Sequence, residues 1–122
     1  MALVRLVAQI AIALGILNVW ALRFGKPTGW RGGTAKNMKE EFEVYGLPPW
    51  FMTSIGFLKL SLAVLLIVGV WFSALTRPAA LGMAVLMLGA VSMHVKVKDP
   101  LRKSLPAFTM LVLCLLVALT PG

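Results

Sequence analysis

The segment GFLKLSLAVLLIVGVWF (residues 56–72) contains a single charged side chain, Lys59. It belongs to an apolar run over about residues 50–72, and similar runs cover about residues 3–22, 78–95 and 101–119. A helix rises about 1.5 Å per residue, so each run is long enough to cross roughly 30 Å of hydrocarbon. Because backbone groups must be paired in lipid, the four runs are predicted to be membrane-spanning helices.

The composition supports the same fold class. The chain has 122 residues, of which 60% are hydrophobic and 13% charged, and its mean hydropathy is +0.92. A soluble domain of this length has too little interior to bury so much apolar surface. We therefore predict a single transmembrane domain over residues 1–122, an all-α integral membrane protein folded as a four-helix antiparallel bundle in a lipid bilayer.

The connection between the first two runs, residues 23–49, is long and highly charged. Within it, Met38, Phe42 and Tyr45 recur at helical spacing, and Gly46 with the following prolines provides a stop signal. This pattern predicts a short amphipathic helix between spans 1 and 2. The helix would lie either at the membrane interface or packed against the bundle.

The basic residues are distributed unequally between the two sides of the predicted bundle. The first and third connections carry nine of them, whereas the other side has only Arg5 and Arg77. By the positive-inside rule, both termini are predicted outside and the basic connections cytoplasmic in a multi-pass protein of the cell membrane. The formal net charge of +8 does not indicate nucleic acid as a partner, because the basic residues form no exposed stripe with interleaved aromatics.

Lys59 lies inside the second run, roughly 14 Å from the start of that helix at Trp50. Small residues at Gly56 and Ala63 share its face, which favours a position facing the bundle rather than lipid. We predict that Lys59 contributes to a cavity open toward the basic side, together with Asn18, Arg23, His94 and Asp99. The alternatives are a lysine that snorkels to the surface and a histidine that is merely hydrogen-bonded at the interface.

The sequence contains no catalytic motif and no metal-ligand pattern. It has one histidine and one cysteine, Cys114, so neither a disulfide within the chain nor a CxxC pair can form. No catalytic residue, metal ligand or cofactor site is assigned from the sequence, and whether the protein is an enzyme stays open.

The stretch NVWALRFGKPTGWRGGTAKNMKEEFEVYGLPPWFMTSIGFLKL (residues 18–60) and the segment GAVSMHVKVKDP (residues 89–100), with the four-span layout, resemble the DoxX-like family of small bacterial membrane proteins. The most specific points are YGLPPWF, GFLKL and HVKVKDP. The resemblance places Lys59, His94 and Asp99 at polar positions of the family. It implies a link to membrane redox complexes, because DoxX proper is the small subunit of a membrane thiosulfate:quinone oxidoreductase. The long charged connection differs from that of DoxX proper, which puts the thiosulfate reaction itself in doubt.

The expected function is therefore a small subunit of, or an accessory to, a membrane redox system. It would bind a quinone-like or lipid ligand near Lys59 and His94, with Trp20, Trp30 or Trp50 packing on a ring. The redox cofactor would belong to a partner protein, and a bundle this small fits self-association into a homo-oligomer.

Two alternatives remain. In one, the protein assists assembly by docking partner helices through small residues, for which the candidates are Ala11, Gly15, Gly82 and Gly89. In the other, it is a small transporter that uses Lys59 as a counter-charge for its substrate.

Overall fold

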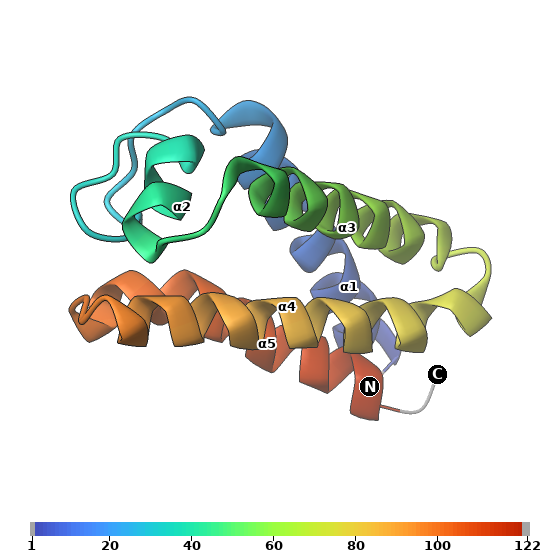
Figure 1. The fold of residues 1–122 in the computed structure, drawn as a ribbon. Coiled ribbons are helices and arrows are strands. Elements are labelled where there is room, and N and C mark those ends of the chain that lie inside the picture. Colours follow the sequence, from blue (N-terminus) through green and yellow to red (C-terminus); the bar gives the residue numbers. More distant parts are fainter. Residues whose placement is uncertain (1, 121–122) are drawn as a thin grey trace.

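A computed structural model describes residues 2–120, which form a bundle of long helices with a short helix across one end (Figure 1). In chain order the elements are α1 (Ala2–Leu17), the π-helical turn η1 (Asn18–Leu22), α2 (Met38–Tyr45), α3 (Pro49–Val68), the 3-10 turn η2 (Ser73–Leu75), α4 (Thr76–Lys96) and α5 (Leu101–Leu119). Four helical segments are long and apolar enough to span a membrane: α1 with η1, α3, η2 with α4, and α5. The predicted all-α four-helix bundle is confirmed.

The four long helices form a ring. α1 and α4 each pack against both α3 and α5, and the pair α4–α5 makes the most extensive contact. Successive long helices run in opposite directions, so the N- and C-terminal ends lie at the same end of the bundle (Figure 1). We call this the terminal end, and the opposite end, which carries α2 and the turn between α4 and α5, the basic end.

The second and third spans differ slightly from the expected limits. α3 ends at Val68 rather than near residue 72, and α4 begins at Thr76 rather than at Pro78. The chain turns at Gly69, whose N–H donates to the Leu65 carbonyl at 2.8 Å. Trp71 and Phe72 follow as exposed side chains in the turn, which is a common place for aromatic residues at a membrane interface.

Polar groups connect the helices at the terminal end. Nε2 of Gln9 donates to the Leu66 carbonyl at 2.6 Å and to Oγ1 of Thr76 at 3.2 Å, so one α1 side chain ties α3 to α4. Nearby core positions hold small residues, such as Ala63 and Ala80, both fully buried. Small residues allow close helix approach and buried polar groups need partners, so this half of the bundle is tightly packed.

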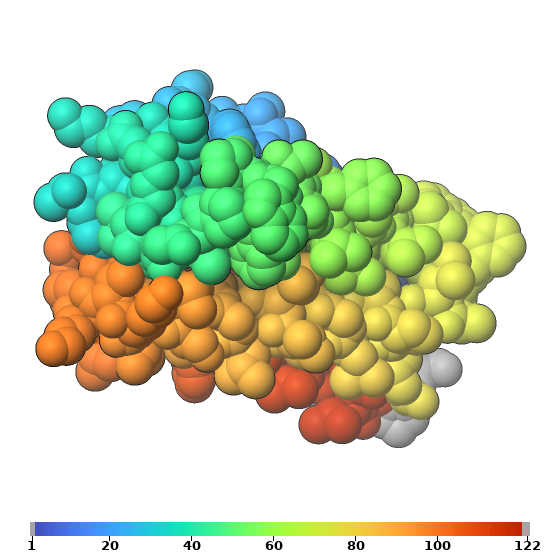
Figure 2. All heavy atoms as spheres, viewed as in Figure 1, coloured from blue at the N-terminus to red at the C-terminus, as the bar shows by residue number. Residues whose placement is uncertain are grey.

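α2 forms as predicted, and its ends follow from local chemistry. The Asn37 side chain accepts a hydrogen bond from the Glu40 N–H at 2.8 Å, and Gly46 ends the helix with a φ of 77°. Met38, Phe42 and Tyr45 are all buried. Their face packs on the bundle, as shown by the edge contact of Phe42 with Trp20 at 6.0 Å between ring centroids. This helix packs on the bundle, and Figure 2 shows α2 and the preceding loop covering the basic end.

Candidate ligand-binding cavity

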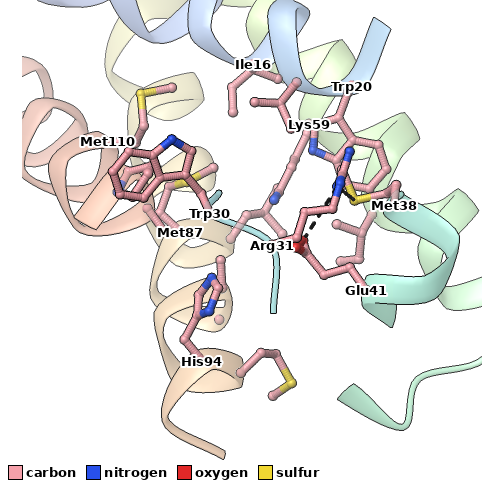
Figure 3. A pocket seen from close by; sticks show the side chains of 18 of the residues that line it. Ile16, Trp20, Trp30, Arg31, Met38, Glu41, Lys59, Met87, His94 and Met110 are labelled. Carbon is pink, nitrogen blue, oxygen red and sulfur yellow. Dashed lines mark hydrogen bonds and ion pairs between the residues drawn. The ribbon is translucent and has the colours of Figure 1, made fainter. Parts of the chain in front are cut away.

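A cavity of about 1160 Å³ lies in the basic half of the bundle (Figure 3). Its walls come from all four long helices, and α2 with the loop of residues 23–37 closes it toward the basic end. Most of its lining side chains are apolar, including Ile16, Met87 and Met110. This volume is slightly above the usual range of about 300–1,000 Å³ for small-molecule sites, so the cavity has room for a ring system with part of a hydrocarbon chain.

Lys59 projects into this cavity from α3. The residue is 9% exposed, and its Nζ lies 5.3 Å from the centroid of the Trp20 ring, within cation–π range. Among residues 2–120, Nζ has neither a hydrogen-bond acceptor nor an ion-pair partner within bonding distance. Figure 3 shows the ammonium directed toward the centre of the cavity, so Lys59 faces the bundle and not lipid.

Trp20 reaches Lys59 because of two local features. It lies in the π-helical turn η1, where the extra residue rotates the side chains relative to α1. It also packs directly on α3 at Gly56, where a Cβ atom would lie only 2.6 Å from Cζ3 of the indole. Gly56 is therefore needed so that the ring can lie flat against α3 beside the ammonium.

His94, on α4, is held between two partners. Its Nδ1 lies 2.8 Å from Oδ2 of Asp99, and its Nε2 lies 3.4 Å from the Tyr45 hydroxyl. Burial raises the pKa of the Asp99 carboxyl, but hydrogen bonds from the Gly33 N–H and from His94 outweigh it, and the pKa is lowered overall. An ionised Asp99 is an acceptor only, so Nδ1 carries a proton and Nε2 is the nitrogen that faces Tyr45 and the cavity.

Arg31 organises the loop that covers the cavity. Arg31 is 4% exposed. Its guanidinium donates to the carbonyls of Lys26 at 2.9 Å and Arg23 at 2.6 Å. It also lies 3.9 Å from Oε1 of Glu41. Burial raises the pKa of Glu41, against the lowering effects of the Gly32 N–H, Arg31 and Lys59. Glu41 is thus the one acidic side chain lining the cavity, and it is already engaged by the loop.

Two consecutive glycines let the loop pack on α2. A Cβ on Gly32 would lie 2.5 Å from the Tyr45 ring, and Gly33 has a φ of +56°. The Gly33 N–H donates to Oδ1 of Asp99 at 2.9 Å, and its carbonyl accepts from Nζ of Lys103. We call these two hydrogen bonds the clasp. They join the loop to the turn between α4 and α5.

The cavity also reaches the lipid-facing surface. Val19, Val85 and Leu105 line it, and they are 39%, 70% and 52% exposed. Pro106 is another lining residue, inside α5, where its missing N–H leaves the Arg102 carbonyl without a helical donor. An apolar molecule in the bilayer therefore has a route into the cavity between the helices.

The structure brings together most of the residues predicted to form a site. Six of the eight line the cavity: Asn18, Trp20, Arg23, Trp30, Lys59 and His94. Asp99 does not line it but fixes the His94 ring from behind. Trp50 lies outside, 69% exposed, with its ring against Phe51, so it cannot pack on a ligand in this cavity. Trp50 begins the first turn of α3, where an outward-facing indole suits the membrane interface.

The lining residues that sequence reasoning did not single out include Arg31, Glu41 and Tyr45. The RGG stretch that carries Arg31 was a detectable signal, because consecutive glycines in a loop often mark close packing. Tyr45 was recognised only as part of an apolar helix face. Its hydroxyl becomes relevant through the contact with His94, which is 49 residues away in sequence.

The glycines proposed for partner docking either contact other helices of the same bundle or face the cavity. A Cβ on Gly15 would meet Met110 at 2.8 Å, and one on Gly82 would meet Leu62 at 3.3 Å. Gly89 lines the cavity. Gly15 and Gly82 therefore support packing within this chain, whereas nothing lies within 4 Å of a Cβ placed on Gly89.

The fold and the cavity define a class of protein: a small multi-pass membrane protein, a four-span bundle with an internal, mainly apolar cavity that contains a buried lysine. The family model described as DoxX-like family matches residues 7–119, and the chain belongs to this family. Comparisons with curated proteins and with solved structures found no significant match.

Proposed function

We propose that this DoxX-like protein binds a quinone-like or lipid ligand in the cavity, as a small subunit of, or accessory to, a membrane redox system. The observation that carries the proposal is the Lys59 ammonium, buried at the edge of an apolar cavity without a hydrogen-bond acceptor among residues 2–120. A lysine at membrane depth costs a few kcal/mol. A ligand oxygen at the position that Nζ faces would supply the missing acceptor.

His94 and Tyr45, which line another part of the cavity, could transfer a proton to a ligand. Asp99 accepts from Nδ1 of His94 and fixes the orientation of the ring, while Nε2 exchanges a hydrogen bond with the Tyr45 hydroxyl. A proton on Nε2 could pass to the Tyr45 oxygen as the Tyr45 hydroxyl donates to a ligand oxygen. Reduction of a quinone to a quinol takes up two electrons and two protons. In this proposal the chain contributes the ligand site and the proton route, and a partner protein contributes the electrons.

The route into the cavity supports a lipophilic ligand. Val19, Val85 and Leu105 connect the lining to the lipid-facing surface, so a ligand would enter from the bilayer with its polar head leading toward Lys59. For orientation, we infer that the basic end faces the cytoplasm of a bacterial inner membrane, because the basic connections gather there. A cysteine introduced at Lys98 should then react only with thiol reagents supplied from inside, since Cys114 is fully buried.

The test is the small-molecule content of the protein purified in native-lipid discs. Wild type, Lys59→Met and a control, Lys39→Met on the exposed face of α2, are compared at equal helicity and at a temperature well below the thermal transition of each. We expect a quinone or one specific lipid at near-stoichiometric amount in wild type and Lys39→Met, and its loss in Lys59→Met. Decylubiquinone added to quinone-free discs should quench the fluorescence of Trp20 saturably, and Trp20→Phe should remove that component.

Three results separate the alternatives. A specific phospholipid in place of a quinone would retain the cavity as a binding site and remove the redox role. Equal ligand content in wild type and Lys59→Met would refute the assignment of Lys59 as a ligand contact. Solute flux through liposomes containing only this protein would favour the transporter.

A further inference from the structure

A second hollow, of about 550 Å³, lies at the terminal end, away from the cavity described above. It is formed by α1, by η2 and by the first turn of α4, and its lining residues are Arg5, Ser73, Ala74, Arg77, Pro78 and Leu81. Arg5 and Arg77 are the only two basic residues on this side of the bundle, and both line the same hollow. Nothing in the proposed function uses them.

The two guanidinium groups are anchored at one place. Nε of Arg5 donates to the Val117 carbonyl at 3.1 Å, and Nε of Arg77 donates to the Ala118 carbonyl at 2.8 Å. These carbonyls belong to consecutive residues in the last turn of α5, whose carbonyls lack helical donors. Because each Nε is fixed, both side chains are oriented before any ligand binds. Arg77 uses one further nitrogen, Nη2, for the Thr120 carbonyl at 3.4 Å.

The remaining nitrogens have no partner in the part of the chain that the structure describes. Both Nη atoms of Arg5 and Nη1 of Arg77 make no hydrogen bond within residues 2–120. Arg5 as a residue is only 8% exposed, and its unpartnered Nη atoms are accessible where they line the hollow. Arg77 is exposed. Two guanidinium charges that line one hollow disfavour each other, and an anion bound between them would remove that repulsion.

The chain supplies no acidic side chain for this role. All four carboxylates, Glu40, Glu41, Glu43 and Asp99, lie in the connections of the basic end. At the hollow, the start of α4 adds the positive end of a helix dipole, and Ser73 adds a hydroxyl. The free Nη atoms, two on Arg5 and one on Arg77, together with a helix N-terminus, are donors of the kind that bind a phosphate group.

The level of the hollow in the membrane indicates where that phosphate comes from. Trp71 and Phe72, 74% and 64% exposed, immediately precede Ser73 and mark the membrane–water interface, where lipid headgroups lie. We propose that this hollow binds the phosphate of an anionic phospholipid headgroup between Arg5 and Arg77. Free inorganic phosphate carries the same chemistry and is the alternative source that the experiment must separate.

The test measures lipid selectivity of the full chain in discs of phosphatidylcholine with a tenth of phosphatidylglycerol. Native mass spectrometry gives the ratio of the two lipids that stay bound to the protein. Wild type should retain phosphatidylglycerol in clear excess over its share of the disc, and Arg77→Gln should lower this selectivity about tenfold, as for the loss of one charge-assisted contact. Arg102→Gln, an exposed arginine at the basic end, is the matched control and should leave the ratio unchanged.

Because selectivity is a ratio, a uniform loss of stability in Arg77→Gln does not mimic the expected result. Arg5→Gln should act in the same direction, and Arg77→Gln alone carries the test if the buried variant does not fold. Equal retention of both lipids by wild type, or equal loss in Arg77→Gln and Arg102→Gln, would overturn the proposal. A thermal stabilisation by inorganic phosphate as large as that by phosphatidylglycerol would identify a soluble anion as the occupant and refute the lipid assignment.

Discussion

Replacing Lys59 by methionine should make the protein more stable while removing ligand binding. Lys59 is buried, and its ammonium has no acceptor among residues 2–120. On insertion scales a lysine at the centre of a membrane helix costs about 2.5–3.5 kcal/mol. The contact with the Trp20 ring at 5.3 Å offsets roughly 0.5–2 kcal/mol of this.

The difference leaves roughly 0.5–3 kcal/mol in favour of methionine, whose flexible thioether fills a similar volume. In this variant Glu41 loses the favourable charge of Lys59 but keeps the Gly32 N–H and the nearby Arg31. The lost interaction with Glu41 is therefore too small to make Lys59→Met less stable than wild type. A site residue that lowers stability in exchange for function is a common pattern.

The assay is reversible unfolding in mixed micelles, with the free energy of unfolding compared between wild type, Lys59→Met and the exposed control Lys39→Met. We expect the free energy of unfolding to rise by roughly 0.5–3 kcal/mol in Lys59→Met and to change within about 0.5 kcal/mol in the control. A decrease of about 1 kcal/mol or more in Lys59→Met would refute the reasoning, because it would mean that Lys59 is paired in the folded protein and serves its structure.

Three further perturbations address the loop and the helix packing. Asp99→Asn should lower the free energy of unfolding by about 1–2 kcal/mol at neutral pH, because it weakens the hydrogen bond to His94. Because the folded pKa of Asp99 lies below its ordinary 3.8, this stabilisation is complete above that value, and the difference between wild type and variant should shrink as the pH falls below it. Gly32→Ala should cost about 1–3 kcal/mol, since its Cβ would overlap the Tyr45 ring, and should speed proteolysis of the loop. Gln9→Leu should cost about 0.6–2 kcal/mol, measured by unfolding, through loss of two interhelical hydrogen bonds.

Each of these has a matched control in the chain. Glu43→Gln changes an exposed carboxylate of α2 and should show no such pH dependence. Gly25→Ala adds a Cβ to the same loop where nothing lies within 4 Å, so equal proteolysis of both glycine variants would contradict the packing argument. Ser92→Leu changes an exposed polar group that bonds only its own helix, and a cost equal to that of Gln9→Leu would show that the interhelical bonds contribute nothing.

The sequence predicted the fold because its signal is local and strong. Four long apolar runs leave a membrane bundle as the solution, and the burial of Lys59 followed from Gly56 and Ala63 on its face. The burial of Phe42 likewise followed from helical spacing.

The site was predicted only in part, because its geometry depends on contacts between distant residues. The π-helical turn that aims Trp20 at Lys59 has no marker in the sequence. The pairing of Tyr45 with His94 depends on how α2 docks, which periodicity does not specify. Trp50 was predicted to contact the ligand and does not line the cavity. An aromatic residue next to a span is equally compatible with a ligand contact and with an interfacial anchor, and in the structure Trp50 faces outward.

The clasp also constrains the order of events during biosynthesis. Gly33 is bonded to Asp99 and Lys103, which follow it by 66 and 70 residues. When α1 and α3 have been inserted and α2 has been made, the acceptor and donor that secure the loop still belong to the part of the chain that follows. Because α4 and α5 also supply walls of the cavity, the cavity behind the loop is completed only when this last hairpin has been inserted.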